Sequence, residues 1–178
     1  MIENELYDLV HAGDLPGVSK WLDQTPDDLN NFVSDGYAPL HVACLFGHEA
    51  IVHHLINRGA LVNLNAMNAS RATPLHLAVM FRDEETAKRM ALYLLNNGAE
   101  LNAKQDGGQT PLHHAVARGS VILVKALIEE GADPFFEDDL KRSPTDIAKE
   151  LKGESAEQVD EIRSSLKRAF SLPLESRT

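Results

Sequence analysis

The residues of this sequence best suited to metal chemistry are histidines, two of which flank an acid at nearly the spacing of a zinc site. The stretch from His48 to His53 reads H-E-A-I-V-H, one residue longer than the zinc-binding pattern H-E-x-x-H. Histidines four residues apart share one helix face, whereas residues five apart are separated by about 140°. The spacing therefore argues against zinc, although a small metal-dependent or hydrolytic enzyme remains the alternative from another class.

The single cysteine, Cys44, is the other candidate for chemistry. It occupies the small-residue position of its helix, so we expect a buried hydrophobic side chain. A catalytic cysteine needs a lowered thiol pKa and a neighbouring histidine, neither of which the sequence establishes. His53, His54 and His114 have no ligand spacing with it, and we expect them on outer surfaces. No phosphate loop or nucleophile motif occurs, so we expect no enzyme, no cofactor and no metal.

Four segments can be laid over one another, and they indicate the fold. They begin at Ala38, Thr73, Thr110 and Ser143 and read A-P-L-H, T-P-L-H, T-P-L-H and S-P-T-D. The prolines, at positions 39, 74, 111 and 144, are 35, 37 and 33 residues apart. This period is typical of a solenoid built from one repeated unit. Each unit reads as a helix beginning at proline, a turn, a second helix and an extended connection.

The start and end of these helices follow known capping preferences. The hydroxyls of Thr73, Thr110 and Ser143 could cap the first helices, whereas Ala38 cannot. The second helices carry an apolar stripe, such as 51–56, that must be buried against neighbouring repeats. The glycine after each stripe is expected to end the helix in a left-handed conformation.

This pattern resembles the ankyrin-repeat family, whose signature is T-P-L-H-x-A. Gly-Ala pairs at 59, 98 and 131 follow the first three motifs. The resemblance covers roughly residues 4 to 170 and implies an all-α repeat solenoid of stacked helix-turn-helix units joined by β-hairpin-like fingers. It also implies that the motif histidines His41, His76 and His113 are structural and bond to neighbouring backbone.

The resemblance predicts a single ankyrin-repeat domain over residues 1–170. The first and last repeats lack part of the motif and read as polar caps, which suggests a free-standing array. The expected units are a cap at 1–32, repeats at 33–67, 68–104 and 105–137, a second cap at 138–170, and a flexible tail at 171–178.

Two departures from the regular period predict where the chain is longer. The finger around Asn65 to Ser70 carries two extra residues, and the third repeat carries four more between Thr73 and Gly98. Four residues are close to one helical turn, so we expect a longer second helix capped by Asp83 with its buried face kept. Neutral drift at the surface or a protrusion shaped for a partner would each explain these insertions.

Charge narrows the class of partner. The formal charge is -10, and residues 1–35 hold eight acids against one base. No lysine and arginine patch suits nucleic acid, and no apolar run approaches the roughly 18 residues of a membrane helix. The N-terminus lacks the features of a signal peptide and the lone cysteine fits a reducing compartment, so we expect a monomeric cytoplasmic protein. The acidic end either steers a basic protein partner or only keeps a cap solvated.

The family resemblance also implies where a partner binds. Ankyrin-repeat proteins usually bind through the finger tips and through the two positions before the glycine that closes each first helix, which face a concave groove. In the middle repeats those positions are strongly apolar, as interface cores are. Alternatively, these side chains complete the core, with the inserted turn covering Met80 and Phe81. Phe135 and Phe136 either cover the last repeat or extend the apolar surface.

We therefore predict a non-catalytic module that binds a folded protein partner through the concave groove and finger tips. It would inhibit or mask that partner, or serve as a passive scaffold. The predicted partner-binding residues are Tyr37, Leu45, Phe46, Asn65, Met67, Met80, Phe81 and Arg118.

Overall fold

The structure is a computed structural model that describes residues 5–151 and 155–170. Within these ranges the chain forms ten α-helices and one 3-10 helix and contains no strand. The predicted tail at 171–178 lies outside the described residues. The helices are α1 (Glu5–Ala12), α2 (Leu15–Gln24), η1 (Pro26–Asn30), α3 (Pro39–Phe46), α4 (Glu49–Asn57), α5 (Pro74–Met80), α6 (Glu84–Asn96), α7 (Pro111–Ala117), α8 (Val121–Glu129), α9 (Pro144–Glu150) and α10 (Ala156–Phe170).

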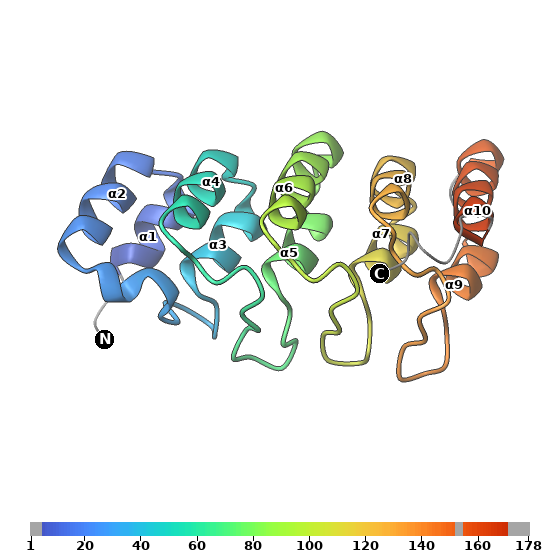
Figure 1. Ribbon diagram of the computed structural model, residues 1–178, viewed down its shortest axis with the longest axis horizontal. Coiled ribbons are helices and arrows are strands. Elements are labelled where there is room, and N and C mark those ends of the chain that lie inside the picture. The colour runs from blue at the N-terminus through green and yellow to red at the C-terminus, as the bar shows by residue number, and fades with distance from the viewer. Residues whose placement is uncertain (1–4, 152–154, 171–178) are drawn as a thin grey trace. The chain divides into compact units, whose positions relative to one another are not determined.

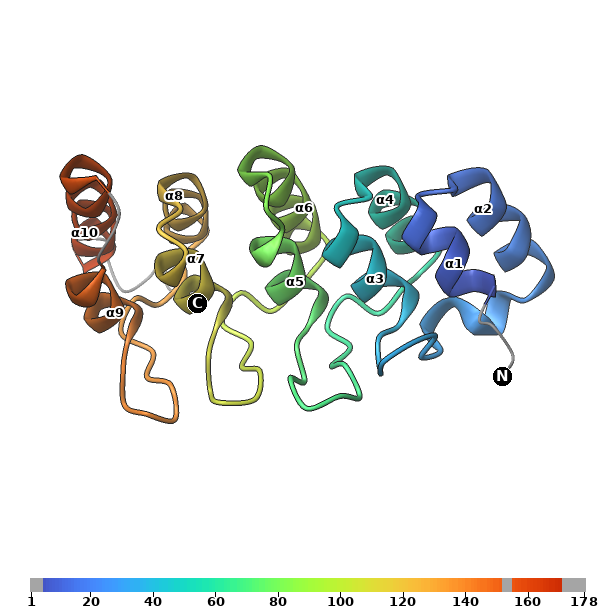
Figure 2. The same cartoon turned by 180° about the vertical axis from the view of Figure 1, so that it is seen from behind.

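The chain divides into two compact units, residues 1–99 and 100–178. In the first unit three helix pairs lie side by side in chain order, with the connecting loops projecting from one end (Figures 1 and 2). There α1 packs on α3 and α3 packs on α5, while the second helices α2, α4 and α6 form another row. In the second unit α7 packs on α9 and α8 on α10. The predicted all-α repeat architecture is confirmed.

Each helix pair is held by the apolar stripes that the sequence pattern predicts. Ile51, Val52 and Leu55 of α4 are buried, and Ile56 is half-buried. Full burial of such a side chain contributes roughly 1.5–3 kcal/mol. The three glycines after the stripes, Gly59, Gly98 and Gly131, have φ values of 93°, 88° and 94°, so the predicted left-handed helix ends are confirmed.

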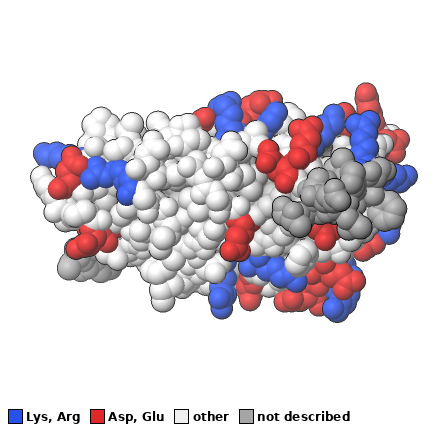
Figure 3. Space-filling model, in the orientation of Figure 1, with Lys and Arg blue, Asp and Glu red and all other residues white. Residues whose placement is uncertain are grey.

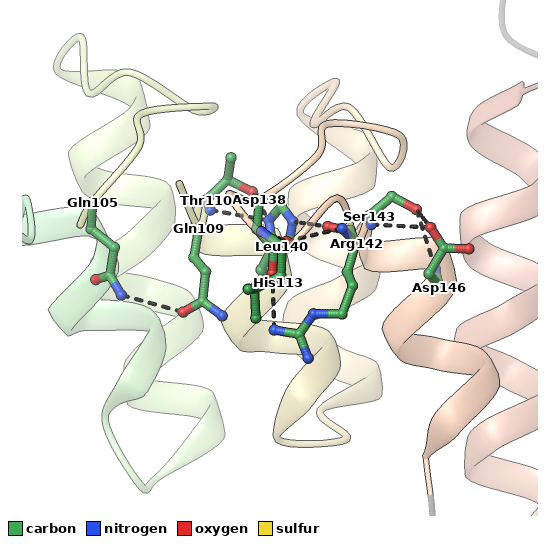
Figure 4. A network of polar contacts seen from close by, with 9 residues as sticks. All are labelled: Gln105, Gln109, Thr110, His113, Asp138, Leu140, Arg142, Ser143 and Asp146. Carbon is green, nitrogen blue, oxygen red and sulfur yellow. Dashed lines mark hydrogen bonds and ion pairs between the residues drawn. The ribbon is translucent and has the colours of Figure 1, made fainter. Parts of the chain in front are cut away.

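The motif histidines His41 and His113 each tie a first helix, α3 and α7, to the following loop. The Ala38 amide donates to Nδ1 of His41 at 3.3 Å, and Nε2 of the same ring lies 3.1 Å from the carbonyl of Ala72. In the second unit His113 accepts from the Thr110 amide at 3.0 Å and lies 3.1 Å from the Arg142 carbonyl (Figure 4). Because Nδ1 accepts an N–H, the proton is on Nε2, which donates to the loop carbonyl.

The loops themselves make few backbone hydrogen bonds. The Ala66 amide donates to the Ala72 carbonyl at 2.9 Å, and the Asp138 amide donates to the Arg142 carbonyl at 3.0 Å. Each loop therefore turns back on itself as a hairpin does. The imidazole bond to the loop carbonyl then fixes the turn against the helix.

The prediction of three hydroxyl caps is wrong for two of the helices. The hydroxyls of Thr73 and Thr110 each lie 2.8 Å from Nδ1 of the motif histidine and make no bond to the helix amides. Only Ser143 accepts a helix amide, from Asp146 at 3.2 Å. The threonine hydroxyls donate to the ring because its Nδ1 is a buried acceptor three residues away.

The two predicted insertions lie where the period places them. Helix α6 has 13 residues, whereas α4 and α8 have nine each, and Asp83 caps it by accepting the Thr86 amide at 2.9 Å. In the longer finger, Met67 donates its amide to the Gly36 carbonyl at 2.7 Å and the Asn68 side chain donates to the Asp35 carbonyl at 2.9 Å. The extra residues therefore rest on the preceding loop.

The expected surface positions are wrong for two histidines. His54 and His114 are half-buried, and the Nε2 atom of each is enclosed by protein. Burial, with a smaller contribution from the charge of His113, lowers the pKa of His114 to about 4. His53 is also half-buried, with its ring 3.9 Å from that of Tyr93.

The neutral motif imidazoles predict a stability that falls in mild acid. Burial lowers the pKa of His41 from 6.5 to about 4, against opposing hydrogen bonds to the Leu64 and Ala72 carbonyls. Between these values the unfolded chain binds the proton that the folded chain excludes, so stability present above pH 6.5 is lost as the pH falls toward 4. The loss from His41 alone should reach about 2 kcal/mol at pH 5.

Urea unfolding at pH 7.5 and pH 5 measures this loss. His41→Gln removes the titrating ring and should reduce the difference between the two pH values, whereas the exposed His11→Gln should keep it. An NMR titration in which His41 protonates near pH 6.5 would contradict the assignment.

Candidate protein-binding site

The eight predicted partner-binding residues lie in separate places. Leu45 and Phe46 end α3, and Met80 ends α5 with Phe81 directly after it. Asn65 and Met67 lie on the finger between α4 and α5, while Tyr37 lies in the loop before α3 and Arg118 caps α7 in the second unit. The first four define what we call the first-helix surface, together with Tyr7 and His11 of α1.

Aromatic rings join the first two repeats across this surface. The ring of Tyr7 stacks on His11 at 5.6 Å, and His11 meets Phe46 edge to face at 4.3 Å. Such aromatic pairs contribute about 0.5–1.5 kcal/mol beyond their buried area. His48, the residue before α4, reaches back and places Nε2 2.8 Å from the His11 carbonyl. Phe46 is half-buried as a result and its position is fixed by neighbours on both sides.

Leu45 and Met80 stay exposed beside these rings. Leu45 is 37% exposed and Met80 is 51% exposed, so the inserted turn of α6 does not cover Met80. The two residues end first helices that pack against each other. Two solvent-facing apolar side chains therefore lie at matching ends of neighbouring repeats.

Phe81 differs from Phe46 although the sequence places them at equivalent positions. Its φ of -63° and ψ of 136° are extended, so α5 ends one residue earlier than α3. The closing glycine of α3 is Gly47, with φ of 74°, and Arg82 replaces it in the third repeat. Helix α7 also ends one residue earlier than α3 although Gly119 follows it, but its equivalent residue, Arg118, keeps a helical φ of -84° and ψ of -2°. Phe81 is half-buried, and its ring lies directly over Gly47.

The remaining predicted residues do not join this cluster. Tyr37 is half-buried, and its backbone N–H closes the first loop by donating a hydrogen bond to the Ser34 carbonyl at 2.7 Å. The ring centre of Tyr37 lies 5.8 Å from that of His41. Its position is compatible with a structural role. Arg118 is half-buried, and its amide donates to the His114 carbonyl at 3.1 Å.

Asn65 and Met67 instead line a groove that the repeat pattern does not predict. Its volume is about 590 Å³, and four further apolar side chains contribute to it, those of Phe32, Leu61, Val62 and Leu64. The signal available in the sequence was a stretch without charge at 59–70. We call this the finger groove; its lining residues are Phe32, Leu61, Val62, Asn63, Leu64, Asn65 and Met67.

In the second unit, the two adjacent phenylalanines have different surroundings. Phe136 is half-buried with the Lys104 ammonium 4.6 Å from its ring centre, and Phe135 is exposed. Leu140, on the same loop, is also exposed. Whether these two residues cover the last repeat or extend an apolar surface stays a prediction.

The cysteine and the possible metal ligands of the described chain show no arrangement suited to catalysis or metal binding. Cys44 is fully buried, which raises the pKa of its thiol above the ordinary value and disfavours the thiolate. Among residues 5–151 and 155–170, no cluster of three histidine, cysteine, aspartate or glutamate side chains could hold a metal ion. The helices of the described chain also include none with the length and apolar character to cross a bilayer.

Sequence comparison agrees with the repeat architecture. A family model described as "Ankyrin repeats (3 copies)" matches residues 6–105, and another described as "Ankyrin repeats (many copies)" matches 87–128. The first covers more than half of the chain. The chain therefore belongs to the ankyrin-repeat family, whose members generally mediate protein–protein interactions.

Relatives share part of their length with this chain. The probable 26S proteasome regulatory subunit p28 of Saccharomyces cerevisiae is 35% identical over 106 residues, which is 60% of this chain and 42% of that protein. The B-cell lymphoma 3 protein homolog of Mus musculus is 30% identical over 137 residues, 77% of this chain and 28% of that protein. Alpha-latrotoxin-Lh1a of Latrodectus hasselti is 37% identical over 97 residues, 54% of this chain and 7% of that protein. The chain thus spans less than half of each.

The contact between Phe81 and Gly47 predicts a difference between two glycine substitutions. A Cβ atom on Gly47 would lie 2.1 Å from Cζ of Phe81, whereas one on Gly59 would meet nothing within 4 Å. Both glycines have positive φ, so each alanine costs roughly 1–2 kcal/mol of backbone strain. Gly47→Ala should cost about 1 kcal/mol more than Gly59→Ala because the Phe81 ring must move.

The free energies of unfolding in urea test this difference. The extra cost should disappear when Gly47→Ala is made in a Phe81→Ala background, because the steric partner is then absent. Equal costs for the two single variants would show that Phe81 leaves its position freely.

Proposed function

We propose that the chain is a non-catalytic module that binds a folded protein partner through the first-helix surface. The observation that carries this proposal is the pair of exposed apolar side chains, Leu45 and Met80, at matching ends of packed helices. Leucine and methionine exposed beside fixed aromatic rings resemble the core of an interface more than an ordinary monomer surface. The family's general role in protein interaction supports the same conclusion.

The order already present in this surface favours tight binding. Phe46 is held by His11, and Phe81 rests on Gly47. Immobilising a free side chain at an interface costs about 0.5–1.5 kcal/mol, and this cost is reduced where packing has already restricted the ring. A rigid apolar surface of this kind suits a partner with a preformed complementary shape.

Binding would act by covering part of the partner. We propose that the chain masks or inhibits its partner, with a passive scaffolding role as the alternative. The yeast relative named as a probable regulatory subunit supports a role within an assembly. We further propose a monomeric protein of the cytoplasm, a reducing compartment that suits an unpaired buried cysteine.

The double variant Leu45→Asp with Met80→Asp should fold and lose partner binding. Both positions are exposed, so the carboxylates stay hydrated in the free chain but would be desolvated against an apolar partner surface. Proteins retained from a native cell extract by the wild-type chain and lost with the variant are identified by mass spectrometry. The affinity of a purified partner should fall by at least about 2 kcal/mol, or roughly 30-fold.

Leu140→Asp is the matched control, because Leu140 is 71% exposed on a loop of the second unit. It should capture the same proteins as the wild type. If the double variant is folded by circular dichroism and still captures them all, the first-helix surface is not the binding site. An assay of the partner's own activity with and without the chain then separates masking from scaffolding.

A further inference from the structure

The finger groove is a second apolar surface, and the four apolar residues of the first-helix surface do not line it. Phe32 is 37% exposed, Leu61 is 55% exposed and Met67 is 73% exposed. Met67 is held at the finger tip by the bond from its amide to the Gly36 carbonyl, so its exposure reflects a fixed backbone position. Large exposed apolar side chains that gather around one groove usually indicate a binding site rather than an ordinary solvated loop.

The groove differs from the other loops in charge. No charged residue occurs from Gly59 to Ser70, although the whole chain carries 27 acids and 17 bases. The later loops, 98–109 and 131–142, both contain acids and bases. In Figure 3 the N-terminal unit presents a broad surface without charged side chains over the segment that follows α4. A charged partner group would lose water there without gaining an opposite charge, which favours an uncharged occupant.

The backbone of the groove contains groups available to a partner. Leu61 donates its amide to the Asn30 side chain at 2.8 Å, and Ala66 donates its amide to the Ala72 carbonyl at 2.9 Å. Between them, Val62 and Asn65 make no hydrogen bond to any residue of the described chain. Asn65 is exposed and Val62 half-buried, so their amides and carbonyls can bond to a peptide backbone lying in the groove.

The size of the apolar patch argues against a second copy of the chain as occupant. A fully exposed side chain of this size has an accessible surface of about 200 Å². The exposed fractions of Phe32, Leu61 and Met67 therefore correspond to a combined solvent-accessible area of roughly 300 Å². A stable interface between two folded proteins buries about 800 Å² on each partner. A groove of about 590 Å³ is instead within the range that holds a small ligand or a few side chains of a peptide.

We propose that the finger groove binds a short, extended and uncharged segment of a partner protein. Apolar side chains of the segment pack on Phe32, Leu61 and Met67, and its backbone bonds to Val62 and Asn65. This site is separate from the one under the proposed function, so the chain holds a partner at two places or holds two partners.

Selection from a phage-displayed library of random heptapeptides tests the proposal. The wild-type chain is the bait, and the double variant Leu61→Lys with Met67→Lys removes peptides that bind elsewhere. Enriched peptides should carry apolar residues and lack charge at their central positions. A synthetic enriched peptide should bind the double variant at least tenfold more weakly and bind Leu140→Lys as it binds the wild type. In NMR spectra it should shift the amide signals of Val62 and Asn65.

Three results would overturn the proposal. They are the absence of any peptide that distinguishes wild type from variant, enrichment of charged peptides, and a wild-type dimer in sedimentation that the variant abolishes. Leu61→Ser with Met67→Ser gives the same comparison with less change in charge, should the lysine variant prove unstable. Because Leu45→Asp with Met80→Asp leaves the groove intact, peptide binding by that variant separates this proposal from the proposed function.

Discussion

The buried motif imidazole is the interaction on which the repeats that begin with α3, α5 and α7 depend. One nitrogen of His41 accepts the amide that begins its own helix, and the other donates to a carbonyl of the following loop. The loops make few backbone hydrogen bonds of their own. Without the ring, the loop carbonyl that accepts from it would be removed from water without a hydrogen-bond donor in return. The same ring must stay neutral to serve both groups. Its placement fixes the loop, and the loop in turn fixes where the next first helix begins.

Much of this arrangement could be predicted because it repeats. The proline-led motif marks where each first helix begins, and the 51–56 stripe indicates a buried helix face. The helix pairs and the lengthened α6 can therefore be predicted from residue spacing alone. The extended backbone of Phe81 was harder to predict, because its ring covers Gly47 of the preceding repeat and the repeat pattern carries no sign of that contact. The bonds of the Thr73 and Thr110 hydroxyls also could not be predicted, since local geometry decides whether a hydroxyl bonds to a helix amide or to an imidazole.

The two candidate sites also differ in how far the repeat pattern predicts them. Leu45 and Met80 could be found because each precedes a position that the repeat pattern identifies. Phe32 and Leu61 could not, because they come from different repeats that meet through bonds between loops, such as the one from the Leu61 amide to the Asn30 side chain. The two surfaces also differ in kind: one is built on helix ends braced by aromatic contacts, and the other on a loop with unused backbone groups. Surfaces of the second kind leave little periodic trace in a sequence.

The extra turn of α6 has a consequence for how such a chain can change over time. Inserting one residue rotates every later side chain by about 100°, which would turn the buried Met90 and Leu94 toward water. Four residues rotate them by only about 40° beyond a full turn, which neighbouring side chains can absorb. Insertions and deletions in the second helices are therefore tolerated in whole turns, while the loops accept them one or two residues at a time. Evolution can therefore lengthen the second helices of this protein only in increments that the helix geometry permits.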